Sequence, residues 1–172
     1  MELIQKMVKL KELSTEDGKD IYNMLQDIDR EENGFHNVAY GMNYEEYKEF
    51  LKSNKRMAEG KDLKEGYVPQ TIYWLYVDGK PVGIAKLRHY LNEHLREKGG
   101  HAAYAVRKSE RGKGYGKLIL KKLVNKAAEK DINELLLTVD DDNTASRKVI
   151  EANGGQLENI KNGECYYWIK NI

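Results

Sequence analysis

Apolar and charged residues alternate between Met7 and Leu13, which predicts a β-strand at the edge of a sheet. A helical period follows, and we expect Ser14 or Thr15 to cap that helix. Its buried face would consist of four apolar side chains: Ile21, Met24, Leu25 and Ile28. The alternation and the helical period together predict a strand followed by a helix at the start of the chain.

A second helix is predicted to begin at Asn43 and to end near Gly60. Its apolar positions recur at helical spacing in Tyr44, Tyr47, Phe50 and Leu51. Residues 30–42 between the two helices show no clear period but are rich in aromatic side chains. We interpret them as a loop that packs over another part of the molecule.

From Thr71 onward the pattern is typical of strands. The run 72–77 stops at Asp78-Gly79, a hairpin signal, and residues 82–89 return antiparallel. A further strand is predicted at 101–107, a helix at 116–130 and a short apolar strand at 135–139, of the kind found at a sheet centre. A helix capped by Asn143 and closed by Gly154-Gly155 then precedes a terminal hairpin that ends in the strand 166–169.

This order of elements predicts an α/β fold with a mixed, mostly antiparallel central sheet and helices on both faces. At 172 residues the chain is long enough for one domain, so we expect a single domain over 1–172. No stretch approaches the ~20 apolar residues of a membrane span, and the N-terminus lacks the apolar core of a signal peptide. We therefore expect a cytoplasmic protein.

The charge of the chain argues against a polyanionic partner. Lys+Arg number 29 and Asp+Glu number 28, so no net field attracts nucleic acid or an anionic membrane. The lysines at 113, 117, 121 and 122 are more simply a solvated helix face. Cys165 is the sole cysteine, which excludes an internal disulfide and favours a buried apolar role.

The glycine-rich segment 111–117 carries the clearest functional signal. A strand leads into a turn that opens a helix, and the unpaired N–H groups at such a helix start suit a phosphate or pyrophosphate. The Walker pattern fails because Leu118 follows Gly116-Lys117, and the dinucleotide fingerprint fails because it requires glycine at Lys117. A turn whose glycines serve geometry alone remains the alternative.

The spacing Arg111-x-x-Gly114-x-Gly116 resembles the acyl-CoA loop of the GNAT acetyltransferase superfamily. The resemblance implies that the strand before the loop contacts the pantetheine arm, here through Ala105 and Val106. It also implies a cradle for the coenzyme A pyrophosphate, which would comprise Arg111, Gly112, Lys113, Gly114, Tyr115, Gly116 and Lys117.

A second part of the sequence supports the same resemblance. Asn143-x-x-Ser146, followed by Asn153-Gly154-Gly155, is similar to a branch of predicted acetyltransferases, in which this helix flanks the pantetheine and thiol. Asn143 also has a simpler reading as a helix cap. The tyrosine that protonates the departing thiolate in many family members is replaced by Ile150, so we consider Tyr104, or else Tyr166, for that role.

The resemblance implies an N-acetyltransferase that moves the acetyl group of acetyl-CoA to a primary amine of a small molecule or peptide. Since the sequence offers no activated nucleophile, we expect direct attack in a ternary complex, without a metal. The alternative is a non-catalytic module that binds or senses acyl-CoA. No nucleic acid or membrane partner is expected, and a homodimer stays open.

The general base must remove a proton from an amine whose pKa is near ~10.4. On the strand before the glycine loop, His101 is the residue that titrates near pH 7, so we predict it as the base. His89 and Glu93 are the next candidates. The family often places a glutamate one residue earlier, where this chain has Gly100.

The acceptor itself is not encoded in a motif. The resemblance implies that N-terminal loops form its pocket, here residues 30–42 and 87–96. Acidic and aromatic side chains in those loops, among them Glu31, Glu32 and Tyr40, would suit a cationic amine, although solvated loop charges are the simpler reading.

Overall fold

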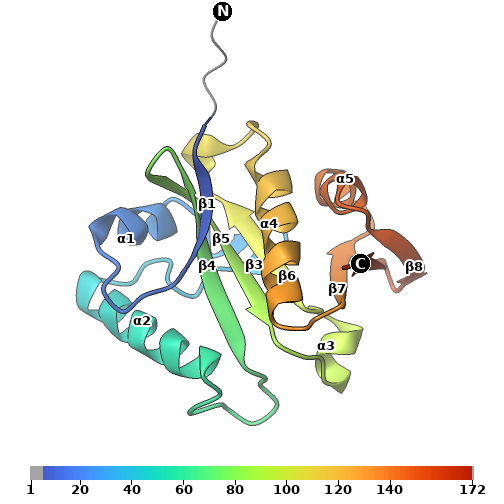
Figure 1. Ribbon diagram of the computed structural model, residues 1–172, viewed down its shortest axis with the longest axis horizontal. Helices are drawn as coiled ribbons and strands as arrows, with labels where there is room; N and C mark the ends of the chain where they lie inside the picture. The colour runs from blue at the N-terminus through green and yellow to red at the C-terminus, as the bar shows by residue number, and fades with distance from the viewer. Residues whose placement is uncertain (1–5, 172) are drawn as a thin grey trace, which may run out of the picture.

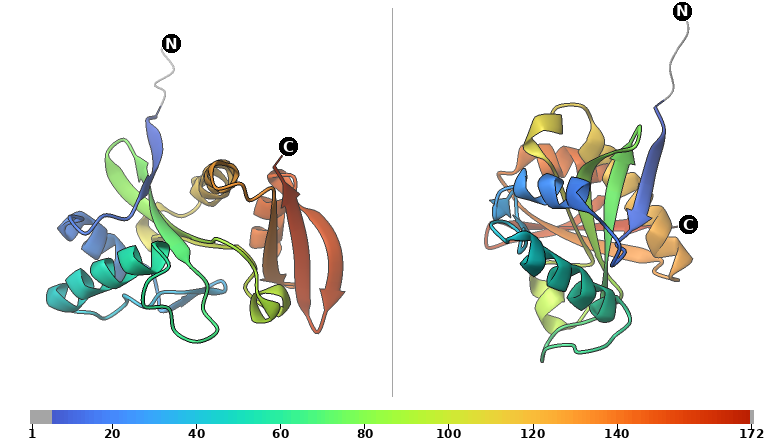
Figure 2. Two further views of the ribbon diagram at one scale, coloured as in Figure 1. Left: turned by 60° about the horizontal axis from the view of Figure 1, so that its bottom comes forward. Right: turned by 90° about the vertical axis from the view of Figure 1, so that its left-hand side faces the viewer.

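A computed structural model describes residues 6–171 and has seven principal strands in two sheets that lie side by side (Figures 1 and 2). The first sheet has the order β1-β4-β5-β6 and the second the order β7-β9-β8, and all of the paired strands are antiparallel. The strands are β1 (Val8–Glu12), β4 (Gln70–Val77), β5 (Lys80–Arg88), β6 (Ala102–Val106), β7 (Glu134–Asp140), β8 (Gln156–Lys161) and β9 (Glu164–Lys170). A separate pair of two-residue strands, β2 (Glu31–Glu32) and β3 (Phe35–His36), forms a small hairpin.

The helices cover both faces of the first sheet, which confirms the predicted fold class (Figure 2). One face carries α1 (Lys19–Gln26) and α2 (Tyr44–Ala58), and the other carries α4 (Tyr115–Glu129). The remaining helices are α3 (Glu93–Glu97), the 3-10 turn η1 (Lys108–Glu110) and α5 (Thr144–Ala152).

The alternation along β4 divides the core in two. Tyr73 and Leu75 pack into the cluster that contains α4, whereas Ile72 and Trp74 pack into the cluster that contains α1 and α2. Successive strand side chains point to opposite faces, so one strand supplies both cores. The short apolar strand expected at a sheet centre is β7, and it lies between β6 and β9 but pairs with β9 alone among the described residues. The prediction of a central strand therefore holds for its burial and not for its pairing.

Two helix starts test the capping predictions. Asn43 caps α2 as expected, and Glu46 completes a reciprocal capping box. The expected cap of α1 at Ser14 or Thr15 is wrong, because α1 begins after Gly18. The backbone N–H of Ser14 instead donates to Asp17 Oδ2 at 2.7 Å, and the same carboxylate oxygen accepts from the Trp74 indole at 2.8 Å. A turn tied to the sheet therefore replaces the first helical turn.

Candidate active site

A cavity of about 300 Å³ lies where β6 and β7 separate. Residues 102–106 of β6 form one wall and residues 137–140 of β7 the other, with Ser146 of α5 and residues 32–35 of the small hairpin at its sides. The strands are linked near the start of β6, where the His101 N–H donates to the Leu136 carbonyl at 2.8 Å. Beyond that point the edge of β6 that faces β7 has no strand partner among residues 6–171.

Gly100, two residues before β6, lies close to Leu136 of β7. Its φ is +61°, and a Cβ built there would lie 2.2 Å from the Leu136 carbonyl oxygen, closer than any real side chain comes. This is the position at which the family often has a glutamate. No side chain fits there without moving β6 away from β7, so the base cannot be supplied from residue 100.

The glycine-rich loop leaves its backbone donors free. Gly112 and Gly114 have φ of +79° and +81°, and nothing lies within 4 Å of a Cβ built at either position. Within residues 6–171, the N–H groups of residues 112–117 donate to no acceptor. Gly114 precedes a helix of 15 residues without a side-chain cap. These donors, together with the positive end of the helix dipole, form a site for an anion.

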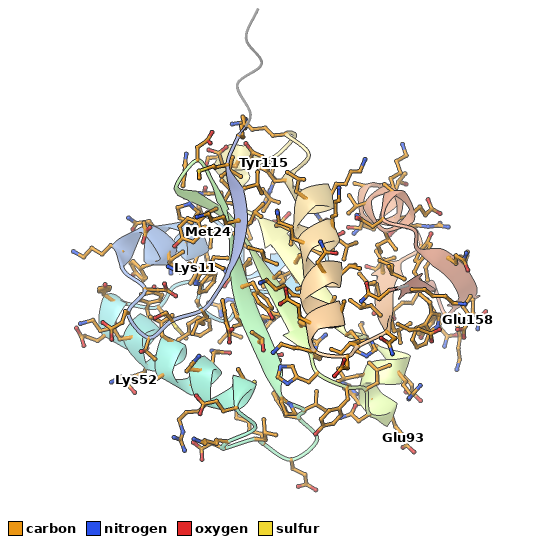
Figure 3. All side chains as sticks on the ribbon, viewed as in Figure 1. Lys11, Met24, Lys52, Glu93, Tyr115 and Glu158 are labelled. Atoms are coloured by element: carbon orange, nitrogen blue, oxygen red, sulfur yellow. The ribbon has the colours of Figure 1, made fainter. Side chains whose placement is uncertain are left out.

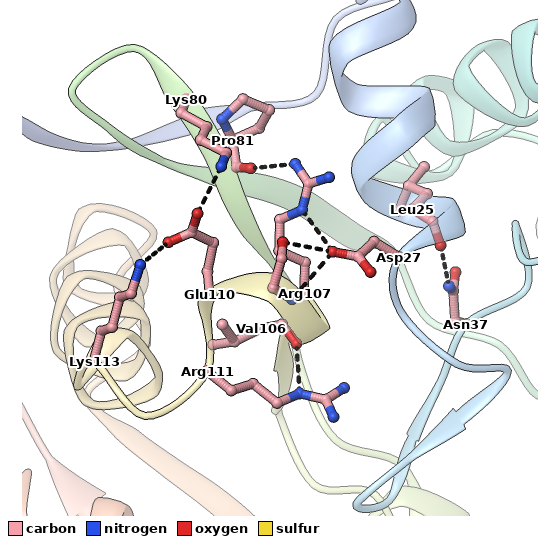
Figure 4. A network of polar contacts seen from close by, with 11 residues as sticks. Leu25, Asp27, Asn37, Lys80, Pro81, Val106, Arg107, Glu110, Arg111 and Lys113 are labelled. Carbon is pink, nitrogen blue, oxygen red and sulfur yellow. Dashed lines mark hydrogen bonds and ion pairs between the residues drawn. The ribbon is translucent and has the colours of Figure 1, made fainter.

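The segment that leads from β6 into the glycine-rich loop is fixed to the end of α1 by an ion pair (Figure 4). Arg107 Nε donates to Asp27 Oδ2 at 3.0 Å, and the Ser109 hydroxyl donates to the same oxygen at 2.8 Å. Burial disfavours the Asp27 carboxylate, but hydrogen bonds from Arg107 and Ser109 outweigh that effect and lower its pKa. Asp27 lies just past the end of α1, so this contact joins the N-terminal half of the fold to the loop.

A second network binds Lys113 of the loop and Lys80 of β5 to one carboxylate (Figure 4). The buried Glu110 accepts from Lys113 at 2.8 Å and from Lys80 at 2.6 Å, and hydrogen bonds from these two lysines lower its pKa to about 2. Lys113 was predicted to contact the pyrophosphate, and the structure shows its ammonium group bound to Glu110. Arg111 donates to the Val106 carbonyl at 3.3 Å and pairs with Glu32 at 2.8 Å, so it spans the mouth of the cavity.

The predicted cofactor residues separate into two groups. Four of them line the cavity: Ala105, Val106, Arg111 and Ser146. The others do not line it: Gly112, Lys113, Gly114, Tyr115, Gly116, Lys117 and Asn143. The free N–H groups of residues 112–117 therefore lie next to the cavity and not on its walls.

Tyr115 and Asn143 have structural roles in addition to any contact with cofactor. The Tyr115 ring is buried beside β1, where its hydroxyl accepts from Lys6 at 3.2 Å, so this residue can offer the loop only its backbone N–H (Figure 3). Asn143 caps α5 by accepting from the Ser146 N–H at 3.2 Å. The simpler reading of Asn143 as a cap is thus present in the structure.

Tyr104 of β6 lies beside the start of α4 and near Ser146 of α5. Its ring carbon Cε2 lies 3.6 Å from a Cβ built on Gly116, and its buried hydroxyl has no hydrogen-bond partner among the described residues. Burial raises the pKa of Tyr104 to about 12, and the neighbouring Ser146 hydroxyl offsets part of that rise. An unsatisfied hydroxyl that keeps its proton at neutral pH, on the wall of a cavity, is suited to donate that proton.

His101 occupies a different environment from the one expected of a base. Its imidazole is 6% exposed and absent from the cavity walls, and its Nδ1 accepts from the Leu136 N–H at 2.9 Å. Burial, assisted by Arg96 and Arg88, lowers its pKa to about 4. A neutral imidazole that accepts at Nδ1 carries its proton at Nε2, so it has no free lone pair for an amine proton.

The other groups considered for proton transfer also lie away from the cavity walls. His89 shares a 2.8 Å hydrogen bond with the Thr71 hydroxyl, and Glu93 projects outward on α3 (Figure 3). The Tyr166 hydroxyl donates to the Glu97 carbonyl at 2.6 Å. Cys165 is fully buried, and burial raises the pKa of its thiol, which fits the expected absence of a cysteine nucleophile.

One side of the cavity is formed by the hairpin β2–β3, in a segment that the sequence analysis interpreted as a loop without a clear period. Its turn residues Asn33 and Gly34 both have positive φ, and Phe35 is buried against the sheet. An Asn-Gly pair between short extended segments is a strong hairpin signal, and this signal was present in the sequence. Arg88 of β5 also lines the cavity, and the sequence analysis did not predict it as a site residue.

Two properties of the described residues bear on cofactors and membranes. Among residues 6–171 no group of three or more His, Cys, Asp or Glu side chains is placed to hold a metal ion. Within the same residues, no helix is both long enough and apolar enough to cross a membrane.

Comparison with known proteins gives one family and a set of similar structures. The profile of the acetyltransferase (GNAT) family matches residues 21–154. No curated protein sequence gives a significant match. The ribosomal L7/L12 α-N-protein acetyltransferase RimL in complex with coenzyme A is 17% identical, with a TM-score of 0.71 over 95% of this chain and 93% of that one.

Two further structures agree. An acetyl transferase from Salmonella typhimurium that modifies the N-terminal serine of L7/L12 is 16% identical, with a TM-score of 0.66 over 96% of this chain and 95% of that one. The Campylobacter jejuni N-acetyltransferase PseH in complex with acetyl coenzyme A is 14% identical, with a TM-score of 0.62 over 96% of this chain and all (100%) of that one. At these identities the structures establish the fold. The family match shows that the chain belongs to the acetyltransferase (GNAT) family and is an acetyl-CoA-dependent acetyltransferase.

Proposed function

We propose that the chain transfers the acetyl group of acetyl-CoA to a primary amine of a small molecule or peptide, by direct attack in a ternary complex. The observation that supports this is the position of the cavity. Its cofactor side adjoins the free N–H groups of residues 112–117, and its acceptor side is formed by the β2–β3 hairpin. The two substrates would therefore meet between β6 and β7.

The pyrophosphate of the cofactor would bind the loop amides, with the pantetheine arm along the unpaired edge of β6 at Ala105 and Val106. An extended ligand that adds to a free strand edge satisfies backbone groups that otherwise lack partners. Arg111 is the loop cation on the cavity wall, and it would add positive charge next to the phosphates while it stays paired with Glu32.

The chemical step requires a proton donor for the leaving thiolate. The amine nitrogen would attack the thioester carbonyl, and collapse of the tetrahedral intermediate would release coenzyme A. We assign the donor to Tyr104, whose buried hydroxyl has no partner and lies near Ser146. A thiol has a pKa near ~8.5, so the thiolate is a fair leaving group and the donor contributes moderately.

The proton of the amine needs a different acceptor from the one predicted. Glu32 lines the cavity on its acceptor side, whereas His101 does not line it and uses its Nδ1 for Leu136. We therefore favour Glu32 over His101 as the base. Glu32→Gln should lower kcat by about 100-fold, the low end for loss of a general base, and His101→Asn should leave the pH profile of kcat unchanged.

The decisive experiment is turnover of acetyl-CoA with a panel of primary amines, compared between the wild type and Tyr104→Phe. The variant should lower kcat by about 100-fold without changing the Kd of coenzyme A. Tyr166→Phe is the matched control, because its hydroxyl is bound to Glu97 outside the cavity. Tight binding of acetyl-CoA without turnover of any amine would favour the non-catalytic binding module.

A further inference from the structure

Arg88 is a half-buried cation on the acceptor side of the cavity. It lies at the end of β5, and its Nη1 donates to the carbonyls of Gly99 and Gly100 at 3.1 and 3.2 Å. Those two carbonyls are neutral, so they satisfy donors without balancing the charge. Burial lowers the pKa of Arg88, which indicates that its surroundings disfavour the cation.

No carboxylate of residues 6–171 lies within ion-pair distance of the Arg88 guanidinium. Its Nε and Nη2 also have no acceptor among these residues. A guanidinium has five N–H donors in a planar fork that matches a carboxylate. Two or more of those donors therefore remain available at the cavity wall.

Lys86 adds a second cation on the same face of β5, two residues before Arg88. Its ammonium lies 4.6 Å from the centre of the Phe35 ring and donates to the His36 carbonyl at 3.1 Å. Like Arg88, it has no carboxylate partner among the described residues. Arg88 and Lys86 therefore lie near the hairpin without a carboxylate counterion among the described residues.

The acids near these cations already have partners. Glu31 contacts His36 within the hairpin, and Glu32 pairs with Arg111 at 2.8 Å. The other acids of the cavity, Asp140 and Glu164, lie opposite one another at the β7–β9 end. A cation that is partly removed from water without a counterion is costly, and an anionic ligand would remove that cost.

We propose that the acetyl acceptor carries a carboxylate, which Arg88 binds at the acceptor side of the cavity, with Lys86 adding to the positive potential. The acceptor is therefore an amino acid or an acidic peptide, and a purely cationic amine such as a polyamine is disfavoured. This inference rests on the proposed function, and it reverses the sequence-based expectation of an acidic pocket for a cationic amine.

The test compares amine acceptors in pairs that differ by one group, a carboxylate in one member and its primary amide in the other. One arm uses amino acids, and the other uses short peptides with Asp or Asn near the N-terminus. At equal concentrations of unprotonated amine, the wild type should have a kcat/KM about 10- to 100-fold higher on carboxylates, the range for a charged hydrogen bond. The arm with the larger ratio identifies the source of the carboxylate.

Arg88→Gln should abolish that preference, mainly by raising the KM for the carboxylate members of the pairs. Arg88→Lys keeps the charge without the fork and should retain part of the preference. Arg96→Gln, an exposed arginine on α3, is the matched control and should retain all of it. Thermal unfolding checks that each variant folds. If Arg88→Gln does not fold, the carboxylate preference is tested with Arg88→Lys.

Three results would overturn the proposal: equal kcat/KM within pairs in the wild type, an equal loss on both members in Arg88→Gln, or a full preference in Arg88→Lys and Arg88→Gln. Failure of the proposed function is separated by calorimetry with glutamate as probe on the coenzyme A complex. Binding of glutamate that depends on Arg88, without acetyl transfer, retains the anion site and rejects the transferase. If glutamate does not bind and no amine is acetylated, the anion site is rejected as well.

Discussion

The two sides of the cavity differ in the chemical groups that they present to a ligand. The cofactor side presents backbone N–H groups of residues 112–117, held in place by glycines and a helix start. The proposed acceptor side presents side chains, chiefly Arg88 of β5 and Glu32 of the β2–β3 hairpin itself, with Lys86 in contact with the hairpin. Backbone geometry recognises a phosphate in any member of a family, whereas side chains set which amine one member accepts.

The two sides also differ in how they are anchored. The loop is held by the Asp27–Arg107 pair and by Glu110, which is 8% exposed. The hairpin is held through Phe35, through the hydrogen bond from Lys86 to the His36 carbonyl, and through the pair of Glu32 with Arg111 of the loop. We therefore expect substitutions on the cofactor side to act on every reaction of the protein, and those on the acceptor side to act on selectivity.

The largest effect is expected from Gly114→Asp on the cofactor side. The change imposes an L side chain at φ +81° and places a carboxylate beside the phosphate site, so acetyl-CoA affinity should fall by about 100-fold or more. Isothermal calorimetry with coenzyme A measures the loss. Gly154→Asp is the matched control, since its φ is +84° and it too has open space at the Cβ. Unchanged affinity in Gly114→Asp would remove the loop from the cofactor site.

Gly100→Ala should disturb both sides at once. Its methyl group would lie 2.2 Å from the Leu136 carbonyl oxygen, so β6 and β7 must separate where they are joined. We expect a loss of about 2 kcal/mol or more in the free energy of unfolding, together with weaker binding of both substrates. Urea unfolding of the variant checks the first expectation. If Gly100→Ala were as stable as the wild type, β6 and β7 could separate without a cost in free energy.

His101 should affect stability through pH and not the chemical step. Its folded pKa of about 4 lies below the ordinary value of 6.5, so the neutral form is favoured by folding. The contribution is fully present above pH 6.5 and is lost as pH falls toward 4, on the order of 3 kcal/mol. In His101→Asn the free energy of unfolding should fall less over this window. Parallel curves for the two proteins would show that His101 titrates normally.

The smallest effect is expected from Asp27→Ala, which releases the loop from α1. The KM for acetyl-CoA should rise about 3- to 10-fold because the loop amides become less ordered, and kcat should change little. Steady-state kinetics with acetyl-CoA varied provide the measurement. Asp29→Ala, which removes a more exposed pair with Lys108, is the control. Equal KM values in all three proteins would show that the anchor does not order the loop.

The sequence allowed the prediction of the cofactor side because its signals are local. The hairpin at Asp78-Gly79, the loop glycines and the Asn43 and Asn143 caps each act within a few residues, and each is present in the structure. The start of α1 was missed because Asp17 bonds both to Ser14 and, across the fold, to Trp74. No pattern in the residues around Asp17 indicates its contact with Trp74.

The acceptor side depends on contacts between distant residues. Arg88 pairs with no carboxylate among residues 6–171, and this absence becomes visible only when every neighbouring carboxylate has been located. The same is true of His101, whose bond to Leu136 crosses from β6 to β7. The residue type suggested a base at His101, whereas the imidazole accepts a hydrogen bond from the Leu136 N–H and so joins the two strands.

The close contact between Gly100 and Leu136 has a consequence for how such an enzyme can evolve. A single substitution of Gly100 by glutamate would place its Cβ 2.2 Å from the carbonyl oxygen of Leu136. To gain a side-chain base at this position, the chain would need further changes that separate β6 from β7, and we therefore expect single substitutions that supply a base to be tolerated elsewhere on the cavity wall.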